Sequence, residues 1–424
     1  MKPEIKQRIE QLNNGKIPKG YKKTDFGVFP SDWVTDKKLI DIGTFGKGKG
    51  IPGNKMQSDG VPCVGYGDIY MKYNHFHFEE AQSFVDEETA KDSQLIKKGT
   101  LLFTGTGETA EEIGKCVCYN GYSTICAGGD IITFVPQDVN PLFLAYQQYQ
   151  NFSLKKKASF GQGHSVVHIQ KESLEKLNVA YPESKNEQSR IVEILMKWDK
   201  AIELYDKQID ALTRYKAVCL KKMFPIKGQS VPEWRFQGFS GDWEQRKFSD
   251  IAARESSVST TASDIPSVEY EDVVAEEGRL NKDIRLKEAV TSGITFDGSQ
   301  VLYGKLRPYL HNWLNPDFKG IAVGDWWVLK PINMDKNFLY RLIQTQQFDN
   351  IANQSSGSKM PRADWNLISN SEFVVPLSKE EQSKIGVYFD SLDHLITLHQ
   401  RKKEVITNQR KTLQQYLLNG IIRV

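Results

Sequence analysis

Two stretches of the sequence read PESKNEQSRI (residues 182–191) and PLSKEEQSKI (residues 376–385), so the second begins 194 residues after the first. In both, the proline prevents the preceding segment from continuing, and a serine lies three residues before a glutamate, the pattern of a helix capping box. Apolar residues then recur at alternating spacings of four and three, which is typical of a coiled-coil seam. The first seam comprises Ile191, Leu195, Trp198, Ile202, Tyr205, Ile209 and Leu212, continued by Cys219 and Met223, and the second comprises Ile385, Phe389, Leu392, Ile396, Ile406, Leu413 and Leu417. We therefore predict long helices over residues 186–223 and 380–418.

Polar residues interrupt both seams, Lys216 in the first and His399, Lys403 and Arg410 in the second. A helix with one apolar seam cannot bury that seam alone. Each helix could pack only on its own neighbouring domain. The shared start, length and register favour the other interpretation, in which the two helices pack on each other as an antiparallel coiled coil.

The composition is that of an ordinary globular chain of two or more domains, with 424 residues, 39% hydrophobic residues and 26% charged residues. No run approaches the roughly 18 apolar residues of a membrane span, and the N-terminus lacks the apolar core of a signal peptide. The five cysteines form no paired framework, so we expect a reduced, cytoplasmic setting without membrane association. The net charge of +3 is too small to indicate nucleic-acid binding by itself.

The repeat extends beyond the two helices. Short matches occur in the same order in both halves, and this order indicates two homologous domains rather than a solenoid. The matches are FPSDW at 29–33 with FSGDW at 239–243, VPCVGYGDI at 61–69 with IPSVEYEDV at 265–273, KGTLLFTG at 98–105 with DGSQVLYG at 297–304, and GD at 129–130 with GD at 324–325.

The segments between these matches read as short strands separated by glycine-rich turns, with a short helix near residues 141–151 and another near 338–348. We therefore predict an α+β fold, in which two homologous mixed α/β domains are separated by two long helices that form an antiparallel coiled coil with pseudo-twofold symmetry. The first residues resemble the end of a repeat, which suggests a cyclic arrangement that brings the chain ends together, although a frayed terminal helix is the alternative. The predicted parts are an N-terminal helix that completes the cyclic repeat (1–14), the first domain (15–183), the central long helix (184–224), the second domain (225–377), the C-terminal long helix (378–418) and a tail (419–424).

Familiar catalytic motifs are missing from the sequence. It contains no GxxxxGK[ST] nucleotide loop and no Asn-Pro-Pro-aromatic or Asp-Pro-Pro-aromatic methyltransferase centre. The Pro-Asp at 316–317 has no acid-x-Lys at the usual nuclease distance, and GTG at 105–107 lacks the third glycine of a dinucleotide fingerprint. A zinc site could be drawn from Cys63, Cys116, Cys118, Cys126, His75 and His77, but the spacing is not a standard one and the second half has no matching cysteines. Inert buried thiols are the favoured interpretation, and we expect no metal.

Polar, basic loops precede both long helices, at residues 154–165 and 353–362, and further basic segments lie at 46–50 and 305–309. Glycine permits close approach of the backbone to a ligand, lysine binds phosphate, and glutamine or arginine can read base edges with two hydrogen bonds. For any single loop a solvated turn is the alternative, but two such loops at equivalent places favour a DNA contact. The candidate DNA-binding residues are Lys47, Lys49, Lys156, Lys157, Gly161, Gln162, His164, Lys305, Arg307, Ser358, Lys359 and Arg362.

Two divergent domains that alternate with two long helices, each opening with Pro followed by Glu-Gln-x-x-Ile, resemble the DNA-specificity subunit of type I restriction-modification enzymes. The resemblance covers essentially the whole chain, and its most specific part is EQSRI at 187–191 with EQSKI at 381–385. It implies that each domain is a target recognition domain that reads one half of an asymmetric, bipartite double-stranded DNA target. The long helices would set the unread spacer and dock the partner subunits.

The resemblance also implies that the chain is not an enzyme and binds no cofactor itself. Its partners would be two methyltransferase subunits and the restriction (translocase and nuclease) subunits, which would supply the chemistry of S-adenosylmethionine, ATP and Mg. A duplicated coiled-coil adaptor that binds only proteins is the alternative function. The missing motifs disfavour a stand-alone nuclease or methyltransferase.

Overall fold

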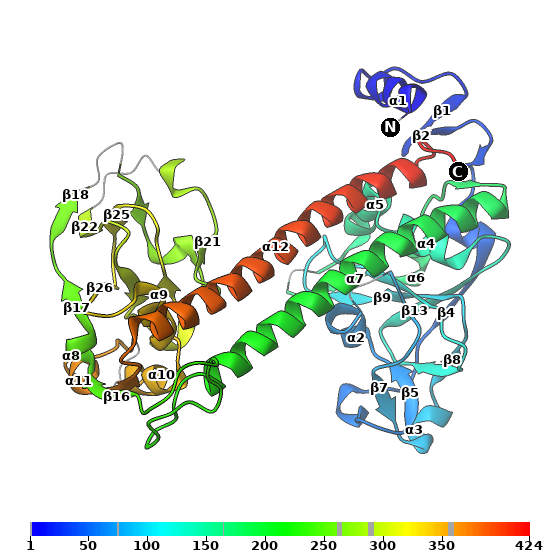
Figure 1. Ribbon diagram of the computed structural model, residues 1–424. Coiled ribbons are helices and arrows are strands. Elements are labelled where there is room, and N and C mark those ends of the chain that lie inside the picture. The colour runs from blue at the N-terminus through cyan, green and yellow to red at the C-terminus, as the bar shows by residue number, and fades with distance from the viewer. Residues whose placement is uncertain (1, 74–75, 164, 261–264, 287–291, 355–359) are drawn as a thin grey trace. The chain divides into compact units, whose positions relative to one another are not determined.

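The two predicted seams lie in two long helices, α7 (Lys185–Lys222) and α12 (Lys379–Leu418), in a computed structural model of the chain (Figure 1). The structure describes all residues except 1, 74–75, 164, 261–264, 287–291 and 355–359. The chain divides into two units: unit 1 comprises residues 1–204 and 404–424, and unit 2 comprises residues 205–403. Each unit therefore contains one part of each long helix.

The long helices pack against each other in opposite directions, as ion pairs in both units show. In unit 1, Arg410 of α12 binds Asp199 of α7, with Nε and Oδ1 2.7 Å apart. In unit 2, Lys216 of α7 binds Asp393 of α12, with Nζ and Oδ1 2.6 Å apart. The two aspartates are 194 residues apart (393 − 199), and so are the two cations (410 − 216), so the pairs are equivalent with the helices exchanged. The antiparallel pairing predicted from the sequence is confirmed. Two of the polar residues that interrupt the seams, Lys216 and Arg410, form ion pairs between the helices.

The remaining interruptions of the second seam are also paired, both within unit 2. The ring of His399 lies 5.9 Å from the ring of Tyr205, edge-on, and these two residues occupy equivalent positions of the repeat (399 − 194 = 205). Lys403 forms an ion pair with Asp206. Polar side chains at these seam positions therefore have partners on the other helix and do not break the helix pairing.

A glutamine at the start of each long helix ties it to a short helix of the same unit. In unit 1, Gln188 accepts a hydrogen bond from the backbone N–H of Asn140 (2.7 Å) and donates one to the carbonyl of Pro182 (2.8 Å). In unit 2, Gln382 accepts from the N–H of Asp335 (2.8 Å) and donates to the carbonyl of Pro376 (2.7 Å). Asn140 and Asp335 are the N-caps of α4 (Pro141–Gln147) and α9 (Lys336–Leu342). Because the glutamines are buried, these bonds fix how each long helix leaves its sheet domain.

The predicted capping box holds for the serines but not for the glutamates. Ser184 and Ser378 accept the backbone N–H of the residue three positions on, each at 3.3 Å. The carboxylate of Glu187 instead binds the guanidinium of Arg423 through two hydrogen bonds of 2.5 and 2.8 Å. The carboxylate of Glu381 binds Arg235 in the same two-bonded way, at 2.7 and 2.8 Å. Both glutamates are buried, which a carboxylate tolerates because the paired arginine compensates its charge.

Unit 1 is built around two mixed sheets. The first has the strand order β4 (Gly43–Lys47), β13 (Ile131–Pro136), β9 (Thr100–Thr104), β11 (Cys116–Tyr119) and β6 (His77–Phe78), antiparallel except for the β11–β6 pair. The second has the order β7 (Ser83–Val85), β5 (Val61–Val64), β12 (Ile125–Ala127) and β8 (Gln94–Ile96). Strand β9 is buried along its whole length, as expected for the central strand of the first sheet.

Unit 2 repeats this plan with two four-stranded sheets. The first has the order β17 (Ala252–Glu255), β26 (Trp326–Pro331), β23 (Val301–Gly304) and β24 (Trp313–Leu314), all antiparallel. The second has the order β18 (Val258–Thr260), β22 (Ser292–Phe296), β25 (Gly320–Ala322) and β19 (Ser267–Val268). The mixed α/β content and the duplication of the sheets confirm the predicted fold class.

Shorter elements complete the two units. In unit 1 they are α1 (Pro3–Asn13), β1 (Tyr21–Thr24), β2 (Gly27–Pro30), β3 (Trp33–Val34), η1 (Leu39–Ile42), η2 (Gly53–Lys55), α2 (Tyr66–Met71), α3 (Glu87–Lys91), β10 (Thr106–Gly107), α5 (Asn151–Phe160), β14 (Val167–His168), α6 (Lys171–Leu174) and β15 (Tyr181–Pro182). In unit 2 they are β16 (Glu244–Lys247), α8 (Phe248–Ile251), η3 (Tyr270–Asp272), β20 (Val273–Val274), β21 (Arg279–Leu280), η4 (Ile284–Leu286), η5 (Pro308–Leu310), α10 (Gln346–Ala352), α11 (Trp365–Asn370) and β27 (Glu372–Val375).

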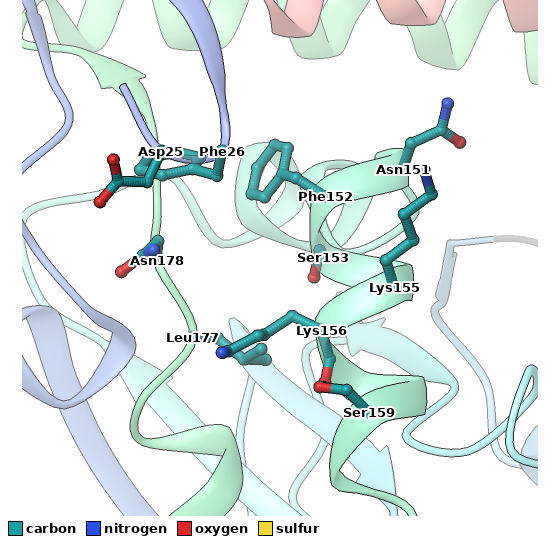
Figure 2. Close-up of a pocket in the computed structure, with 10 residues that line it drawn as sticks. All are labelled: Asp25, Phe26, Asn151, Phe152, Ser153, Lys155, Lys156, Ser159, Leu177 and Asn178. Atoms are coloured by element: carbon teal, nitrogen blue, oxygen red, sulfur yellow. The ribbon is translucent and has the colours of Figure 1, made fainter. Parts of the chain in front are cut away.

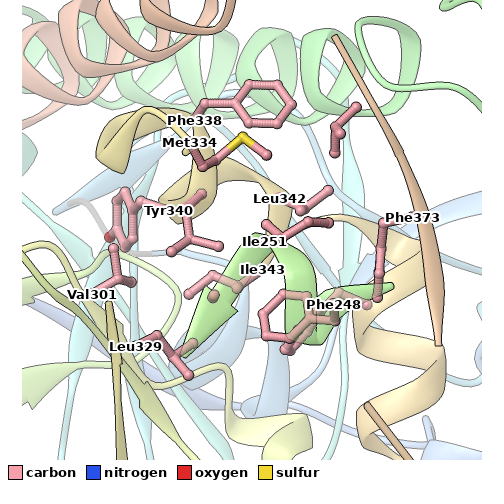
Figure 3. Close-up of a cluster of buried hydrophobic side chains, with 14 of the residues drawn as sticks. Phe248, Ile251, Val301, Leu329, Met334, Phe338, Tyr340, Leu342, Ile343 and Phe373 are labelled. Atoms are coloured by element: carbon pink, nitrogen blue, oxygen red, sulfur yellow. The ribbon is translucent and has the colours of Figure 1, made fainter. Parts of the chain in front are cut away.

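The apolar core of each unit joins its sheet domain to both long helices. In unit 2, side chains from α8, β23, β26, α9 and β27 gather in one cluster, as Figure 3 shows for Phe248, Val301, Leu329 and Phe338. Phe224, just past the end of α7, stacks on Phe338 with ring centroids 5.3 Å apart. The matching cluster of unit 1 contains Phe29, Trp33, Phe143, Ile191, Leu195, Leu417 and Leu418. Neither sheet domain therefore has its full core without the helix ends.

The last residues of the chain are anchored on unit 1, where both ends of the chain lie (Figure 1). The hydroxyl of Tyr21 donates to the carbonyl of Gly420 (2.6 Å), and Arg8 of α1 donates to the carbonyl of Ile421. Arg423 binds Asp32 as well as Glu187, with Nη2 and Oδ2 of Asp32 2.8 Å apart. These contacts connect residues near the start of the chain to residues near its end.

The five cysteines are all buried thiols. Cys63 of β5 lies opposite Cys126 of β12, and burial raises the pKa of Cys63 and of Cys116 to about 12. His75, which belonged to the alternative zinc set, lies outside the described residues. Among the described residues, no group of three or more histidine, cysteine or acidic side chains is placed to hold a metal ion. None of the described helices is both long enough and apolar enough to cross a membrane.

Candidate nucleic-acid interface

In unit 1, backbone hydrogen bonds bring several predicted DNA-binding segments to one end of the first sheet. Gly48, which follows β4, donates to the carbonyl of Ile131 (2.8 Å), and Gly105, which follows β9, donates to the carbonyl of Asp130 (2.7 Å). Ile169, which follows β14, donates to the carbonyl of Gly105 (2.9 Å). A Cβ atom on Gly48 would lie 1.7 Å from the carbonyl oxygen of Gly128, so only glycine allows this approach of the two segments.

The side chains at this end of unit 1 are polar and exposed. Lys47 and Lys49 are exposed on either side of Gly48. Thr106 of β10 lies opposite His168 of β14, with Oγ1 and Nδ1 3.3 Å apart. Gln162, also exposed, forms a backbone bridge with His168 through hydrogen bonds of 3.0 and 2.8 Å. This series of backbone hydrogen bonds links the segment of Lys47 and Lys49 to that of Gln162, which comes much later in the sequence, and Gly161 immediately precedes Gln162. His164 lies outside the described residues.

Unit 2 has the same backbone arrangement at the equivalent end of its first sheet. Lys305, which follows β23, donates its N–H to the carbonyl of Asp325 (2.9 Å), and Ala363 donates to the carbonyl of Lys305 (2.8 Å). Leu306 forms a bridge with Arg362, as Thr106 does with His168 in unit 1. The predicted residues Lys305, Arg307 and Arg362 are thereby brought together, whereas Ser358 and Lys359 lie outside the described residues.

An aspartate that was not among the predicted site residues joins two of the predicted cations in unit 2. The carboxylate of Asp325 accepts hydrogen bonds from Nε (3.2 Å) and Nη2 (3.1 Å) of Arg362. Nζ of Lys305 lies 3.6 Å from the same carboxylate. The hydrogen bonds from Arg362, helped by both positive charges, lower the pKa of Asp325. The signal that could have identified this residue is the Gly-Asp pair at 129–130 and 324–325, which is shared by both halves.

The segment after Lys305 has an unusual backbone. Arg307 and His311, on either side of the short 3-10 turn η5, have φ angles of +47° and +52°. Left-handed conformations of residues other than glycine cost on the order of 1 kcal/mol each and cluster at ligand-binding sites. Tyr309, within this turn, is exposed. The turn therefore presents an aromatic side chain beside the cations of unit 2.

The predicted basic loop at 154–165 is helical over its first half, because α5 continues to Phe160. Lys156 lies on the exposed face of α5 and Lys157 on its buried face, since neighbouring helical residues point about 100° apart. Lys157 is 1% exposed, and its ammonium donates to the carbonyl of Gly114 (2.7 Å). Lys157 cannot contact DNA phosphate from this position, so its prediction as a DNA-binding residue is wrong.

The exposed face of α5 borders a surface hollow of about 600 Å³ (Figure 2). Lys155 and Lys156 line it from α5, and Phe26 and Asn178 line its far side. In Figure 2 the side chain of Lys156 extends toward Leu177.

Replacing Lys157 by methionine should stabilise the protein near pH 7 and lose this advantage as the pH rises. Burial lowers the pKa of Lys157 from its ordinary 10.5 to about 8. Between these values the unfolded chain holds more protons than the folded chain, so the wild-type protein gains stability with rising pH. The shift corresponds to up to about 3 kcal/mol, reduced by about 1 kcal/mol for the lost hydrogen bond to Gly114. Denaturant unfolding of both proteins at pH 7 and pH 9.5 measures the difference, and a difference that does not change with pH would contradict the assignment.

Comparisons with known proteins agree with this architecture. The family described as the type I restriction modification DNA specificity domain matches residues 30–214 and 241–408. The chain is 25% identical to the type I restriction enzyme EcoDI specificity subunit of Escherichia coli, over 94% of this chain and 86% of that protein. It is also 25% identical to the MjaVIII specificity subunit of Methanocaldococcus jannaschii, over 65% of this chain and 70% of that protein.

Solved structures show the same fold. The structure is similar to the S subunit of a type I restriction-modification system from M. genitalium, with a TM-score of 0.60 and 14% identity over 91% of this chain and 96% of that one. A chain from work on the assembly and conformational transition of the type I R-M system has a TM-score of 0.53 and 11% identity, over 96% of this chain and 98% of that one. Since the family match covers both halves of the repeat, this chain belongs to the DNA specificity subunits of type I restriction-modification systems.

Proposed function

We propose that each unit of this chain reads one half of an asymmetric, bipartite double-stranded DNA target through the polar end of its first sheet. The observation that carries the proposal is the repeated backbone frame, in which Gly105, Asp130 and His168 of unit 1 take the places of Lys305, Asp325 and Arg362 of unit 2. The same backbone arrangement with different side chains is expected for two domains that bind DNA in the same orientation but recognise different bases. Cationic and amide side chains at these ends match the donors and acceptors of DNA phosphates and base edges.

We further propose that the long helices dock partner subunits and set the spacer between the two half-sites. Their 38 and 40 residues correspond to about 57–60 Å, longer than the roughly 34–36 Å between successive major grooves on one face of DNA. On α12 within unit 2, Val387, Leu395 and Leu398 are exposed, although Ile385, Phe389 and Leu392 of the seam are buried. An exposed apolar stripe on a helix is a typical protein-binding surface. Two methyltransferase subunits, one for each half of the repeat, are the partners that the duplication supports, with restriction subunits joining the same assembly.

The chemistry in this proposal belongs to the partners. The sequence lacks the nucleotide loop and the amino-methyltransferase centre, which supports a chain that performs no catalysis and binds no cofactor. S-adenosylmethionine would then act in the methyltransferase subunits, and ATP and Mg in the restriction subunits. A cytoplasmic location fits these partners and the reduced thiols.

Salt-dependent DNA binding by the complex with methyltransferase subunits tests the proposal. Binding constants measured from 50 to 200 mM salt should fall steeply, and replacing Lys47 and Lys49 by alanine should reduce the slope of log K against log salt by up to about 2, or about 0.9 for each lost phosphate contact. The matched control replaces Lys2, the N-cap of α1, and Lys6 within α1, which are both exposed, and should leave the slope unchanged.

The same assay separates the proposal from the adaptor function. If the assembled complex shows no salt-dependent DNA binding, the chain is an adaptor for proteins only. An unchanged slope in the Lys47 and Lys49 variant, with intact binding, would remove this end of unit 1 from the DNA interface.

A further inference from the structure

The ion pair between Asp325 and Arg362 uses only one edge of the guanidinium. Asp325 accepts from Nε and Nη2, and no described residue accepts from Nη1. The adjacent edge, formed by Nη1 and the outer hydrogen of Nη2, therefore presents two parallel donors. The side chain of Arg362 is 52% exposed, so a ligand can reach it. Two parallel N–H donors match the O6 and N7 acceptors that guanine shows in the major groove.

The charges around Arg362 favour a base edge over a phosphate. The carboxylate of Asp325 carries the negative charge that a phosphate would meet at close range, and like charges at such distances repel. The guanine edge is neutral and presents only acceptors. Lys305, 3.6 Å from Asp325, compensates the carboxylate and leaves the cluster with one net positive charge. The cluster is thus attractive to DNA in general, while its most directional donors suit one base.

Unit 1 offers a natural comparison at the same backbone positions. Asp130 takes the place of Asp325, but Gly105 replaces Lys305 and His168 replaces Arg362. Unit 1 therefore lacks both the arginine fork and the second cation at this place. The two units share the backbone arrangement, whereas the side chains that could donate hydrogen bonds to DNA differ.

We propose that Asp325 is a positioning residue that orients Arg362 to recognise one guanine in the half-site read by unit 2. The inference rests on the proposed function, because it requires unit 2 to face DNA. Asp325 restrains the arginine side chain before DNA binds, which removes part of the entropy lost on binding. Arg362 contacts the base, and the positive charge of Lys305 compensates the negative charge of Asp325.

The test uses the complex with methyltransferase subunits and its modified sequence, identified by mapping methylated bases. Competition binding with duplexes that carry each base change in turn gives a preference at every position of both half-sites. Wild-type protein should prefer one guanine in the unit 2 half-site by about 5- to 150-fold. Arg362→Lys, which keeps the charge but loses the fork, should lose most of this preference at that position alone. Asp325→Asn, of nearly equal size, should lose part of it.

Controls distinguish the possible failures. Asp283→Asn removes the carboxylate from another exposed arginine, Arg285 of η4, which Asp283 holds through Nε and Nη2, and should change no preference. Preferences in the unit 1 half-site report that each variant is folded and assembled. A wild-type complex that does not discriminate between sequences would defeat the proposed function itself.

With a discriminating wild-type complex, three results would overturn only the role of Asp325 and Arg362. The first is a unit 2 half-site without guanine on either strand. The second is an unchanged guanine preference in both variants. The third is a uniform loss of affinity for all sequences together with a smaller salt slope, which would identify Arg362 as a phosphate contact.

Discussion

Replacing Arg341 by methionine is expected to destabilise unit 2 by about 2–3 kcal/mol, because it removes charge-assisted hydrogen bonds and leaves two partly buried carboxylates without their main partner. Arg341 is 1% exposed, and its guanidinium binds Asp390 and Asp393, each at 2.6 Å. Lys216 also binds Asp393 but reaches only that carboxylate. The loss should appear as a lower denaturant midpoint, followed by tryptophan fluorescence, since all tryptophans except Trp33 and Trp198 lie in unit 2.

Two further variants make this prediction specific. Arg214→Met, on the exposed surface of α7 within the same unit, removes an arginine that binds Asp210 in solvent and should cost less than about 1 kcal/mol. Adding Asp390→Asn to Arg341→Met should restore part of the stability, because Asp390 then carries no uncompensated charge and Asp393 keeps Lys216 as its partner. A loss for Arg341→Met no larger than that for Arg214→Met would show that the ion pairs of Arg341 contribute little.

Exchanging residues 15–183 for the matching segment of another specificity subunit should replace one half of the target and leave the other half unchanged. All described residues at the polar sheet end of unit 1, from Lys47 to His168, lie within this segment. The exchanged segment must still pack on Leu417 and Leu418, which share a core cluster with Phe29, Trp33 and Phe143. Mapping methylated bases in DNA from cells that carry the chimeric complex reads the outcome directly.

The reciprocal exchange of residues 225–377 is the matched control and should change only the other half. Modular reading would be refuted if either exchange altered both halves of the target, or if neither exchange altered any base. A chimera that fails to assemble is recognised by the loss of methylation at both halves, and restoring the core residues of the original chain should then recover it.

The large features of the fold were predictable because they depend on periodic patterns. The seam from Ile191 to Met223 has the coiled-coil period, and its repetition after 194 residues predicts the helix pairing. The partners of polar residues are not periodic, so they were not predictable. Nothing in the local sequence indicates that Glu187 binds Arg423, which is 236 residues away. The burial of Lys157 was not predictable either, because its hydrogen-bond acceptor, the carbonyl of Gly114, lies in a distant segment.

The candidate site was predictable as a set of segments but not as an arrangement. The glycine and lysine content of their segments predicts Lys47, Lys49 and Gln162 as DNA-binding residues. Only the backbone hydrogen bonds show that these segments lie at the same end of the first sheet. Asp325 was visible in the sequence as part of a repeated Gly-Asp pair, yet its link to Arg362 required the bridge between Leu306 and Arg362. Short sequence matches that recur in both halves therefore indicate the backbone arrangement of such a site. The residues that differ around these matches indicate which side chains recognise the bases.

The packing of Leu417 and Leu418 into unit 1 has a consequence for biosynthesis. Unit 1 needs residues 404–424, so about 200 residues must be translated after Leu204 before its core can close. At roughly 5–20 residues per second this takes about 10–40 s. During that interval the nascent unit 1 leaves the apolar side chains of Phe29, Trp33 and Ile191 exposed. Chaperones that hold nascent chains, rather than rapid co-translational folding, would then protect the first half of the molecule until the ribosome has finished the second.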